Sequence, residues 1–423
     1  MTDKALAKNT TWAFLGYGIR QLLRGVYFLI IPRFLGAEQY GAFLGVTSLI
    51  AILAPFATLG IGNILVKNVA RDREVFPEYW GNSLFLSLIS GMILIAIGAV
   101  AARALLPLSI SWTLILLVAV SDLLFIRVLD NACLAFQAFD MLGRNATLNV
   151  TASVVRLLAA VALVLMFRHS DALLWGVFYL ISSIVVCAIA IVWVQRSLGS
   201  PKLALHRLRP EMAEGFYFSL SLSAQTIYND IDKTMVASLS TLSAAGIYGA
   251  AYRIIDTAFL PVRSLLGATY ASFFRHGAKG VQASTQYAKK LLPRPMAYSV
   301  AATALLYFGA PIVPHVLGAE YRPAVDAIRW LSALPILKTV HSFIADSLTG
   351  AGLQGTRTAV QVVVGVVNVA LNFWLIPLYS WRGAAWASLV TDTLLAIGLW
   401  LVLTAKCRQH AVASPASTAS ELA

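Results

Sequence analysis

The sequence predicts an all-α polytopic membrane protein with about twelve transmembrane helices in two six-helix lobes. Three observations support this fold class: the composition, the regular apolar runs and a faint internal duplication. Of the 423 residues, 59% are hydrophobic and only 12% are charged. A typical soluble domain is nearer half apolar and about a quarter charged. The composition therefore excludes an ordinary soluble protein.

The apolar runs come at regular intervals and are long enough to cross a bilayer, which takes about 20 residues in a helix. They lie at 10–32, 40–64, 82–106, 112–136, 146–167, 172–195, 215–239, 245–271, 295–317, 324–348, 358–378 and 383–405. The stretches between them are too short to form a soluble domain. The N-terminus, MTDKALAKNTTW, has no small-residue cleavage site after a short apolar core, so we expect it to be retained.

The basic residues predict the orientation of the helices. With the N-terminus inside, roughly eighteen Lys and Arg fall in cytoplasmic segments and about five fall on the other side. This asymmetry predicts an even number of spans, with both termini in the cytoplasm. Much of the net charge of +13 is then an orientation signal, and nucleic acid is not an expected partner.

A faint internal repeat predicts the division into lobes. LGAEQYGAF at 35–43 and LSAAGIYGAA at 242–251 each follow an apolar run, and their shared Tyr-Gly-Ala letters lie 208 residues apart. We expect lobes at 1–196 and 213–405, a cytoplasmic linker at 197–212 and a disordered cytoplasmic tail at 406–423. An even number of spans per half predicts a pseudo-two-fold axis along the membrane normal, with a site in the cleft between the halves.

Ionisable residues inside the predicted spans indicate a function. They are Arg20, Arg24, Arg127, Arg156, Lys233, Arg253, Arg263, Arg329 and Lys338, with Asp122, Asp130, Asp230, Asp232, Asp256, Asp346 and Asp392. Each costs about 2.5–3.5 kcal/mol near the centre of a bilayer. These side chains therefore have to pair with one another or line water.

Helical spacing gathers several of these residues on common faces. At about 100° per residue, the face of 215–239 carries Gln225, Tyr228, Asn229 and Asp232, with Asp230 and Lys233 beside it. The face of 245–271 carries Arg253, Asp256 and Arg263, and Arg20 and Arg24 lie one turn apart in the first span. Facing stripes would form a hydrated, cationic cavity between the lobes.

A structural role is the alternative for some of these charges. Arg253–Asp256 and Arg127–Asp130 have the spacing of intrahelical ion pairs. Arg20 and Arg24 have no acid within one turn, and arginine forks bind phosphate oxygens well, so these two favour an anionic guest. The six His and three Cys have neither metal-ligand nor disulfide spacing, so we expect no metal, cofactor or catalytic residues.

With these features, the chain resembles the polysaccharide and O-antigen repeat-unit flippases of the multidrug/oligosaccharidyl-lipid/polysaccharide exporter superfamily. The resemblance lies in RFLGAEQYGAF at 33–43, NDIDKTMV at 229–236, GIYGAAYRI at 246–254 and VLGAEYRPAV at 316–325. It implies two six-helix lobes, alternating access, and transport of an undecaprenyl-diphosphate-linked glycan between leaflets. Membrane lipids and polysaccharide polymerase machinery are the other partners that it suggests.

The resemblance also implies roles for the residues singled out above. Arg20, Arg24, Lys233, Arg253 and Arg263 would meet the lipid diphosphate or acidic sugars. Asp230, Asp232 and Asp256 would balance these charges or carry a coupling proton, and sodium coupling stays open as well.

Two other functions remain as alternatives. A drug- or cation-exporting antiporter of the same superfamily would need an uncompensated acid facing its substrate, whereas the first span offers two Arg. A membrane enzyme, such as a glycan polymerase, would need a sizeable outer loop with catalytic groups, whereas stretches such as 33–40 and 318–323 are short.

Overall fold

The computed structural model describes residues 3–208 and 211–419, and in these ranges the chain forms helices and no strand. The chain divides into two compact units, the first ending at Gly246 and the second starting at Ile247. Eight of the described helices or helix pairs are long and apolar enough to cross a membrane. The all-α polytopic fold is thus confirmed, while the division into twelve spans stays a prediction.

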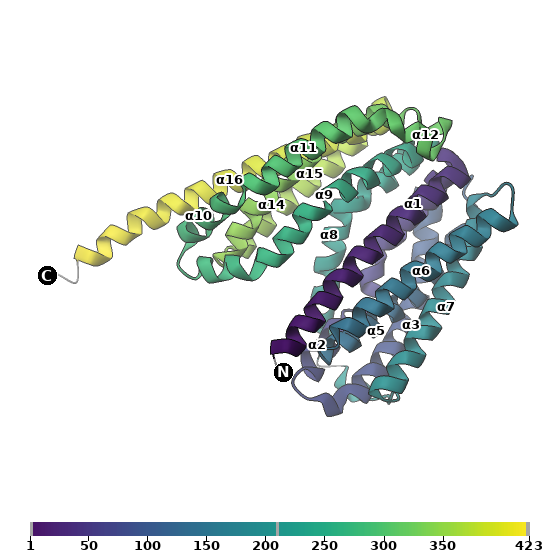
Figure 1. Ribbon diagram of the computed structural model, residues 1–423, viewed down its shortest axis with the longest axis horizontal. Helices are drawn as coiled ribbons and strands as arrows, with labels where there is room; N and C mark the ends of the chain where they lie inside the picture. The colour runs from purple at the N-terminus through teal and green to yellow at the C-terminus, as the bar shows by residue number, and fades with distance from the viewer. Residues whose placement is uncertain (1–2, 209–210, 420–423) are drawn as a thin grey trace. The chain divides into compact units, whose positions relative to one another are not determined.

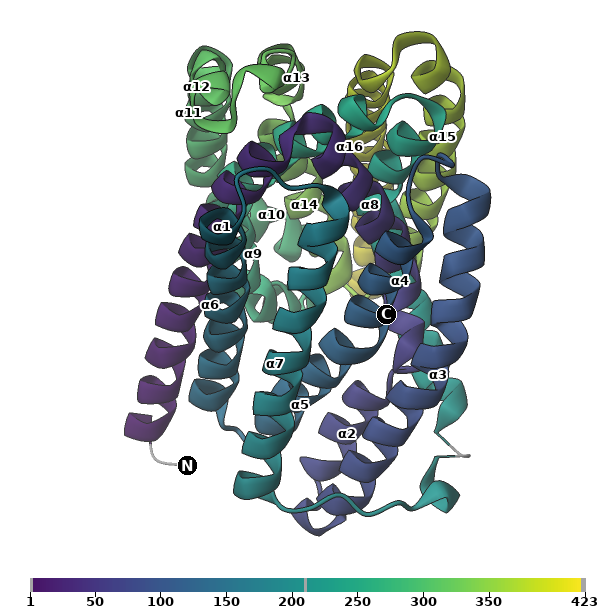
Figure 2. The same cartoon turned by 90° about the vertical axis from the view of Figure 1, so that its right-hand side faces the viewer.

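The N-terminal unit is a bundle in which the long α1 packs against α6 and α8 (Figure 2). Its helices are α1 (Asp3–Leu53), α2 (Ile61–Val69), α3 (Phe76–Leu105), α4 (Trp112–Val120), α5 (Ile126–Ala138), α6 (Leu142–Met166), α7 (Ala172–Leu198) and α8 (Met212–Leu239). Short 3-10 turns lie at Ala54–Ala57, Arg73–Val75 and Leu205–Arg207, and a π-helical turn, Ser121–Phe125, joins α4 to α5. The unit includes α8, which the sequence places in the second lobe.

The C-terminal unit is built on α9 (Leu242–Gly277), whose first residues belong to the N-terminal unit. It continues with α10 (Val281–Leu291), α11 (Pro293–Gly309), α12 (Val313–Leu317), α13 (Ala324–Leu331), α14 (Leu334–Gly350), α15 (Gln354–Tyr379) and α16 (Trp381–Ala419), and 3-10 turns lie at Ala310–Ile312 and Ala319–Tyr321. α16 packs against α14 and α15 (Figure 1). It is helical up to Ala419, through most of the tail that the sequence predicts to be disordered.

Two predicted spans have different boundaries in the structure. No loop separates the first two runs, because the chain only kinks at Gly36 (φ 76°, ψ 172°) and remains helical on both sides. The run 40–64 is instead broken near its end, where Leu59 and Gly60 both have positive φ. Likewise, the run 324–348 forms α13 and α14, and Pro335 lies in the first turn of α14. Proline suits a first helical turn because it has no N–H to donate.

The first motif of the internal repeat lies against the start of the second, residues 242–246, inside the N-terminal unit. A methyl group at Gly41 would overlap the carbonyl oxygen of Leu242, and one at Gly246 would overlap that of Ala37. Nearby, Gly45 faces Ala237 of α8. Glycine at these positions lets two backbones approach closely, as small residues do between membrane helices. These glycines therefore allow α1 to pack tightly on α8 and on the start of α9.

The predicted linker follows the surface of the N-terminal unit and is bonded to it. Asn82 of α3 donates to the Ala204 carbonyl (2.8 Å) and accepts from the Ala204 N–H (3.0 Å). The Lys202 N–H donates to the Pro77 carbonyl (2.8 Å), and Arg207 pairs with Glu78. Residues 202–207, which follow α7, are therefore held against the N-terminal unit by hydrogen bonds and an ion pair.

The contact between the repeat motifs can be tested with a matched pair of glycine variants. Gly41→Ala should lower the free energy of unfolding by about 1–3 kcal/mol, because the added methyl overpacks a backbone contact. Gly25→Ala, in the same helix, should be neutral or stabilising, because nothing lies within 4 Å of that methyl position. Thermal unfolding of the two purified proteins in detergent measures this difference. Equal melting temperatures would show that α1 is not packed as described.

Candidate functional site

The arginines of α1 lie on the membrane-crossing part of that helix. Gly16 packs on Ala146 of α6, which fixes one face of α1. Arg20, one turn later, is half-buried, and among the described residues no acceptor lies within hydrogen-bonding distance of its buried Nε. Arg24, a further turn on, is exposed. α1 thus carries two arginines one turn apart: Arg20, which is half-buried and has an Nε without an acceptor among the described residues, and Arg24, which is exposed. Two neighbouring guanidinium groups are suited to binding an anion.

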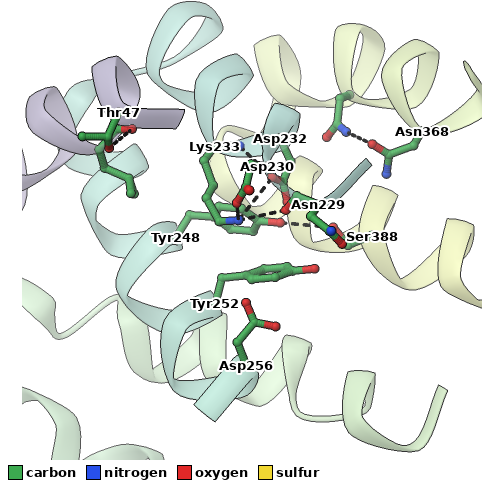
Figure 3. A network of polar contacts seen from close by, with 12 residues as sticks. Thr47, Asn229, Asp230, Asp232, Lys233, Tyr248, Tyr252, Asp256, Asn368 and Ser388 are labelled. Carbon is green, nitrogen blue, oxygen red and sulfur yellow. Dashed lines mark hydrogen bonds and ion pairs between the residues drawn. The ribbon is translucent and has the colours of Figure 1, made fainter. Parts of the chain in front are cut away.

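The charged residues of α8 neutralise one another. Lys233 is buried, and its Nζ lies 2.5 Å from Asp230 Oδ1 and 4.0 Å from Asp232 Oδ1 (Figure 3). It also donates to the Asn229 carbonyl (2.9 Å). This local compensation explains how three ionisable groups fit into a mostly apolar helix.

Three uncharged polar residues of α8, Gln225, Tyr228 and Asn229, are more accessible than Lys233. The side chains of Gln225 and Asn229 are exposed, and Tyr228 is half-buried. Amide and phenol groups of this kind can donate to and accept from sugar hydroxyls. Gln225, Tyr228 and Asn229 are therefore better placed to contact a ligand than Lys233 is.

The acid of α9 is paired to α14 within the C-terminal unit. Asp256 lies 3.1 Å from Lys338 Nζ and 3.9 Å from Arg263. Lys338 also donates to the Tyr252 hydroxyl (3.2 Å), and its Nζ lies 4.6 Å from the centre of that ring. Arg253 and more than half of the Arg263 side chain are exposed. Asp256 is therefore anchored, while Arg253 and Arg263 are accessible.

α14 carries two further ionisable residues, each matched to a different helix. His341 Nε2 lies 3.4 Å from Asp392 of α16, and Asp346 lies 3.5 Å from Arg357 of α15. Sequence reasoning gave no role to Lys338 or His341, because its helical-wheel test sees one helix at a time. The only available signal was that 338, 341 and 346 are all ionisable on one short helix.

The N-terminal unit contains a second polar cluster, built around Asp122 and Arg156. The Tyr179 hydroxyl donates to Asp122 (2.7 Å), which lies on the π-helical turn between α4 and α5. The Arg156 guanidinium lies 3.5 Å from the centre of the Tyr179 ring and donates to Ser183 (2.9 Å). The predicted pair Arg127–Asp130 is confirmed at 3.1 Å.

The structure therefore groups the predicted residues by unit. Asp230, Asp232 and Lys233 form one compensated cluster, and Asp256 forms another with Lys338 and Arg263. The facing of the stripes on α1, α8 and α9 stays a prediction. In the described part of the chain, no group of three or more His, Cys, Asp or Glu could hold a metal ion.

The compensation of Lys233 predicts a specific pattern of stability. Lys233→Met should lower the free energy of unfolding by about 3–5 kcal/mol, because it removes the cation beside the buried Asp232 and the partly exposed Asp230. The double variant Asp230→Asn/Lys233→Met should recover part of that loss, because it removes one of the uncompensated charges. Thermal unfolding of both purified variants measures the recovery. If the double variant is no more stable than the single one, the two side chains are not coupled.

Curated relatives and solved structures resemble the chain over most of its length. It is 24% identical over 373 residues to the "probable low-salt glycan biosynthesis flippase Agl15" of Haloferax volcanii, covering 86% of this chain and 77% of the relative. It is 23% identical over 402 residues to the "putative O-antigen transporter" of Escherichia coli K12, covering 92% of this chain and 94% of that one.

Two solved structures show the same fold. An inward-facing multidrug resistance MATE family transporter of the MOP superfamily superposes with a TM-score of 0.74 at 16% identity, covering 94% of this chain and 99% of that one. The lipid II flippase MurJ in an inward closed conformation gives 0.71 at 12% identity, covering 93% and 87%. A drug transporter and a lipid flippase match about equally well, so the fold does not distinguish between these functions.

The family is established by the sequence itself. The model of the family described as "polysaccharide biosynthesis protein" matches residues 6–271, which is more than half of the chain. The protein belongs to this polysaccharide biosynthesis family.

Proposed function

We propose that this protein flips a lipid-linked oligosaccharide, a repeat unit of a surface polysaccharide, from one leaflet of its membrane to the other. The observation that carries the proposal is the family match together with two relatives, one named as a glycan flippase and one as an O-antigen transporter. The membrane-crossing helices and the absence of a soluble domain among the described residues agree with a transporter.

The accessible arginines support an anionic head group on the cargo. An undecaprenyl-diphosphate carrier presents phosphate oxygens, which the planar fork of arginine binds in a bidentate manner. We assign this role to Arg20 and Arg24 of α1 and to Arg253 and Arg263 of α9. Gln225, Tyr228 and Asn229 of α8 would contact sugar hydroxyls, while the polyprenyl tail stays in the lipid.

Charge balance is the role that the geometry supports for the three acids. Asp230 and Asp232 lie beside Lys233, and Asp256 lies beside Lys338. Lys233 is buried in this pairing, which favours a structural over a substrate-binding role for it. Coupling to protons or sodium through these acids is a separate proposal, and any such ion would compete with the lysine partners.

The proposal includes the membrane in which the protein lies and its orientation there. The distribution of Lys and Arg supports a bacterial cytoplasmic membrane with both chain ends inside. Cargo would then move from the cytoplasmic to the outer leaflet by alternating access, and polysaccharide polymerase machinery would use it there.

Export of a drug or cation is the competing function. The MATE-like fold is compatible with it. Against it stand the relatives' names and the pair of arginines on α1, since a cationic guest would be repelled by them. Resistance to cationic dyes on overexpression would favour this alternative.

The role of Arg24 can be tested in a strain that depends on this protein for its surface glycan. Arg24→Ala should reduce surface glycan at least about tenfold, because a charge-assisted bond to the cargo contributes about 1.5–3 kcal/mol. Arg24→Lys should fall in between, since it keeps the charge but loses the bidentate fork. Glycan on intact cells is measured by lectin or antibody binding, normalised to the protein in the membrane.

Leu22→Ala is the matched control, because Leu22 is an exposed neighbour on the same helix. It should leave the glycan at the wild-type level. Normal glycan in the Arg24→Ala strain at equal protein level would contradict the assignment of this residue.

A further inference from the structure

One end of the C-terminal unit carries a dense basic surface, which we call the C-terminal basic patch. It consists of Arg275 and Lys279 at the end of α9, Lys289 and Lys290 of α10, Arg294 of α11, and Lys406 and Arg408 of α16. All are exposed except Lys406, which is half-buried. No Asp or Glu occurs between residues 257 and 319 or between 393 and 408. The segments 257–319 and 393–408, which form the patch, therefore contribute no carboxylate that could balance its positive charge.

Specific contacts hold the elements of the patch together. The stacked rings of His276 and Tyr287, 4.2 Å between centres, join the end of α9 to α10. Gln282 of α10 donates to the Cys407 carbonyl of α16 (3.1 Å), between Lys406 and Arg408. Figure 1 shows α10 lying beside α16 at this end of the unit. Apart from Lys279, which lies in the turn after α9, the positive charges are thus carried by packed helices.

In the N-terminal unit, two arginines near the chain turns lie beside acids. Arg73 lies 3.6 Å from Asp140, and Arg207 pairs with Glu78. The orientation of membrane helices depends on Lys and Arg and hardly on Asp and Glu. Orientation therefore does not explain why this surface of the C-terminal unit lacks acids. Arg357 of the C-terminal unit also has an acid, Asp346, but that pair is turned into the helix bundle. A fixed cluster of like charges repels itself unless an anionic partner neutralises it.

The surroundings of the patch identify the kind of partner. Arg294, Lys406 and Arg408 lie at the ends of the candidate spans Pro293–Leu317 and Trp381–Gln409, and lipid head groups are expected at the ends of a span. Tyr270 and Phe274 of α9 and Tyr298 of α11 are exposed within a few turns of the patch. Exposed aromatic rings beside basic residues are typical of the membrane–water interface.

We infer that the C-terminal basic patch binds the phosphate groups of anionic phospholipids in the adjoining leaflet. With the orientation proposed above, this is the cytoplasmic leaflet. Bound lipids would neutralise the cluster and hold α10 and the ends of α9, α11 and α16 against the head groups. The inference does not depend on which glycan, if any, the protein transports.

Native mass spectrometry of the full chain in detergent with added phosphatidylglycerol tests the inference. The variant Lys289→Gln/Lys290→Gln/Arg294→Gln should bind this lipid at least about tenfold more weakly, since each Lys or Arg near an anionic surface contributes measurably. The control Arg71→Gln/Arg144→Gln/Arg196→Gln removes three exposed basic residues from the N-terminal unit and should bind as the wild type does. Equal weakening in both, or in neither, would overturn the inference.

Two further arms separate the remaining explanations. Lys289→Arg/Lys290→Arg keeps the charge and should retain binding, and loss of binding in this variant would contradict a charge-based site. Inorganic diphosphate, used as a soluble probe, should displace the lipid only weakly. Displacement at concentrations matching the lipid would show a site for soluble phosphate and overturn the lipid assignment. Because transport is not measured, the result is independent of the proposed function.

Discussion

The cost of a charge in the hydrocarbon layer is the constraint on which the rest of the structure depends. A single ionised side chain near the bilayer centre costs about 2.5–3.5 kcal/mol, and this chain carries many. The structure meets the cost by pairing within each unit. Lys233 is held by its own helix, Lys338 joins α14 to α9, and Asp392 faces His341. The exposed ionisable side chains that we assign to a guest are all arginines: Arg24 on α1, and Arg253 and Arg263 on α9.

This distribution connects packing to function. Asp230, Asp232 and Asp256, the acids nearest the proposed site residues, each lie beside a lysine, whereas Arg253 and Arg263 are exposed. A phosphate-bearing lipid fits that arrangement, and an organic cation does not. Close backbone contacts at Gly41 and Gly246 add a second layer, because they hold the part of α1 that follows the Gly36 kink against the start of α9.

Much of the fold could be predicted from the sequence because hydrophobic length is a local property. The runs 82–106 and 172–195 correspond closely to α3 and α7. Breaks were harder to place: the chain passes 33–40 with a kink at Gly36, whereas Leu59 and Gly60 interrupt the next run. Partners of buried charges were hardest. Spacing along one helix predicted Arg127–Asp130, but the lysine that pairs with Asp256 lies on α14, more than eighty residues away, and only the packing of the helices brings it there.

Transport by the purified protein tests the central claim most directly. Proteoliposomes containing a fluorescent polyprenyl-diphosphate-linked oligosaccharide can be assayed with an impermeant quencher or glycosidase that reaches only the outer leaflet. The account predicts that the wild-type protein makes the inner-leaflet fraction accessible, and that protein-free liposomes do not. It also predicts no comparable movement of a cationic dye. Failure to move the lipid-linked glycan while a cationic dye is transported would contradict it.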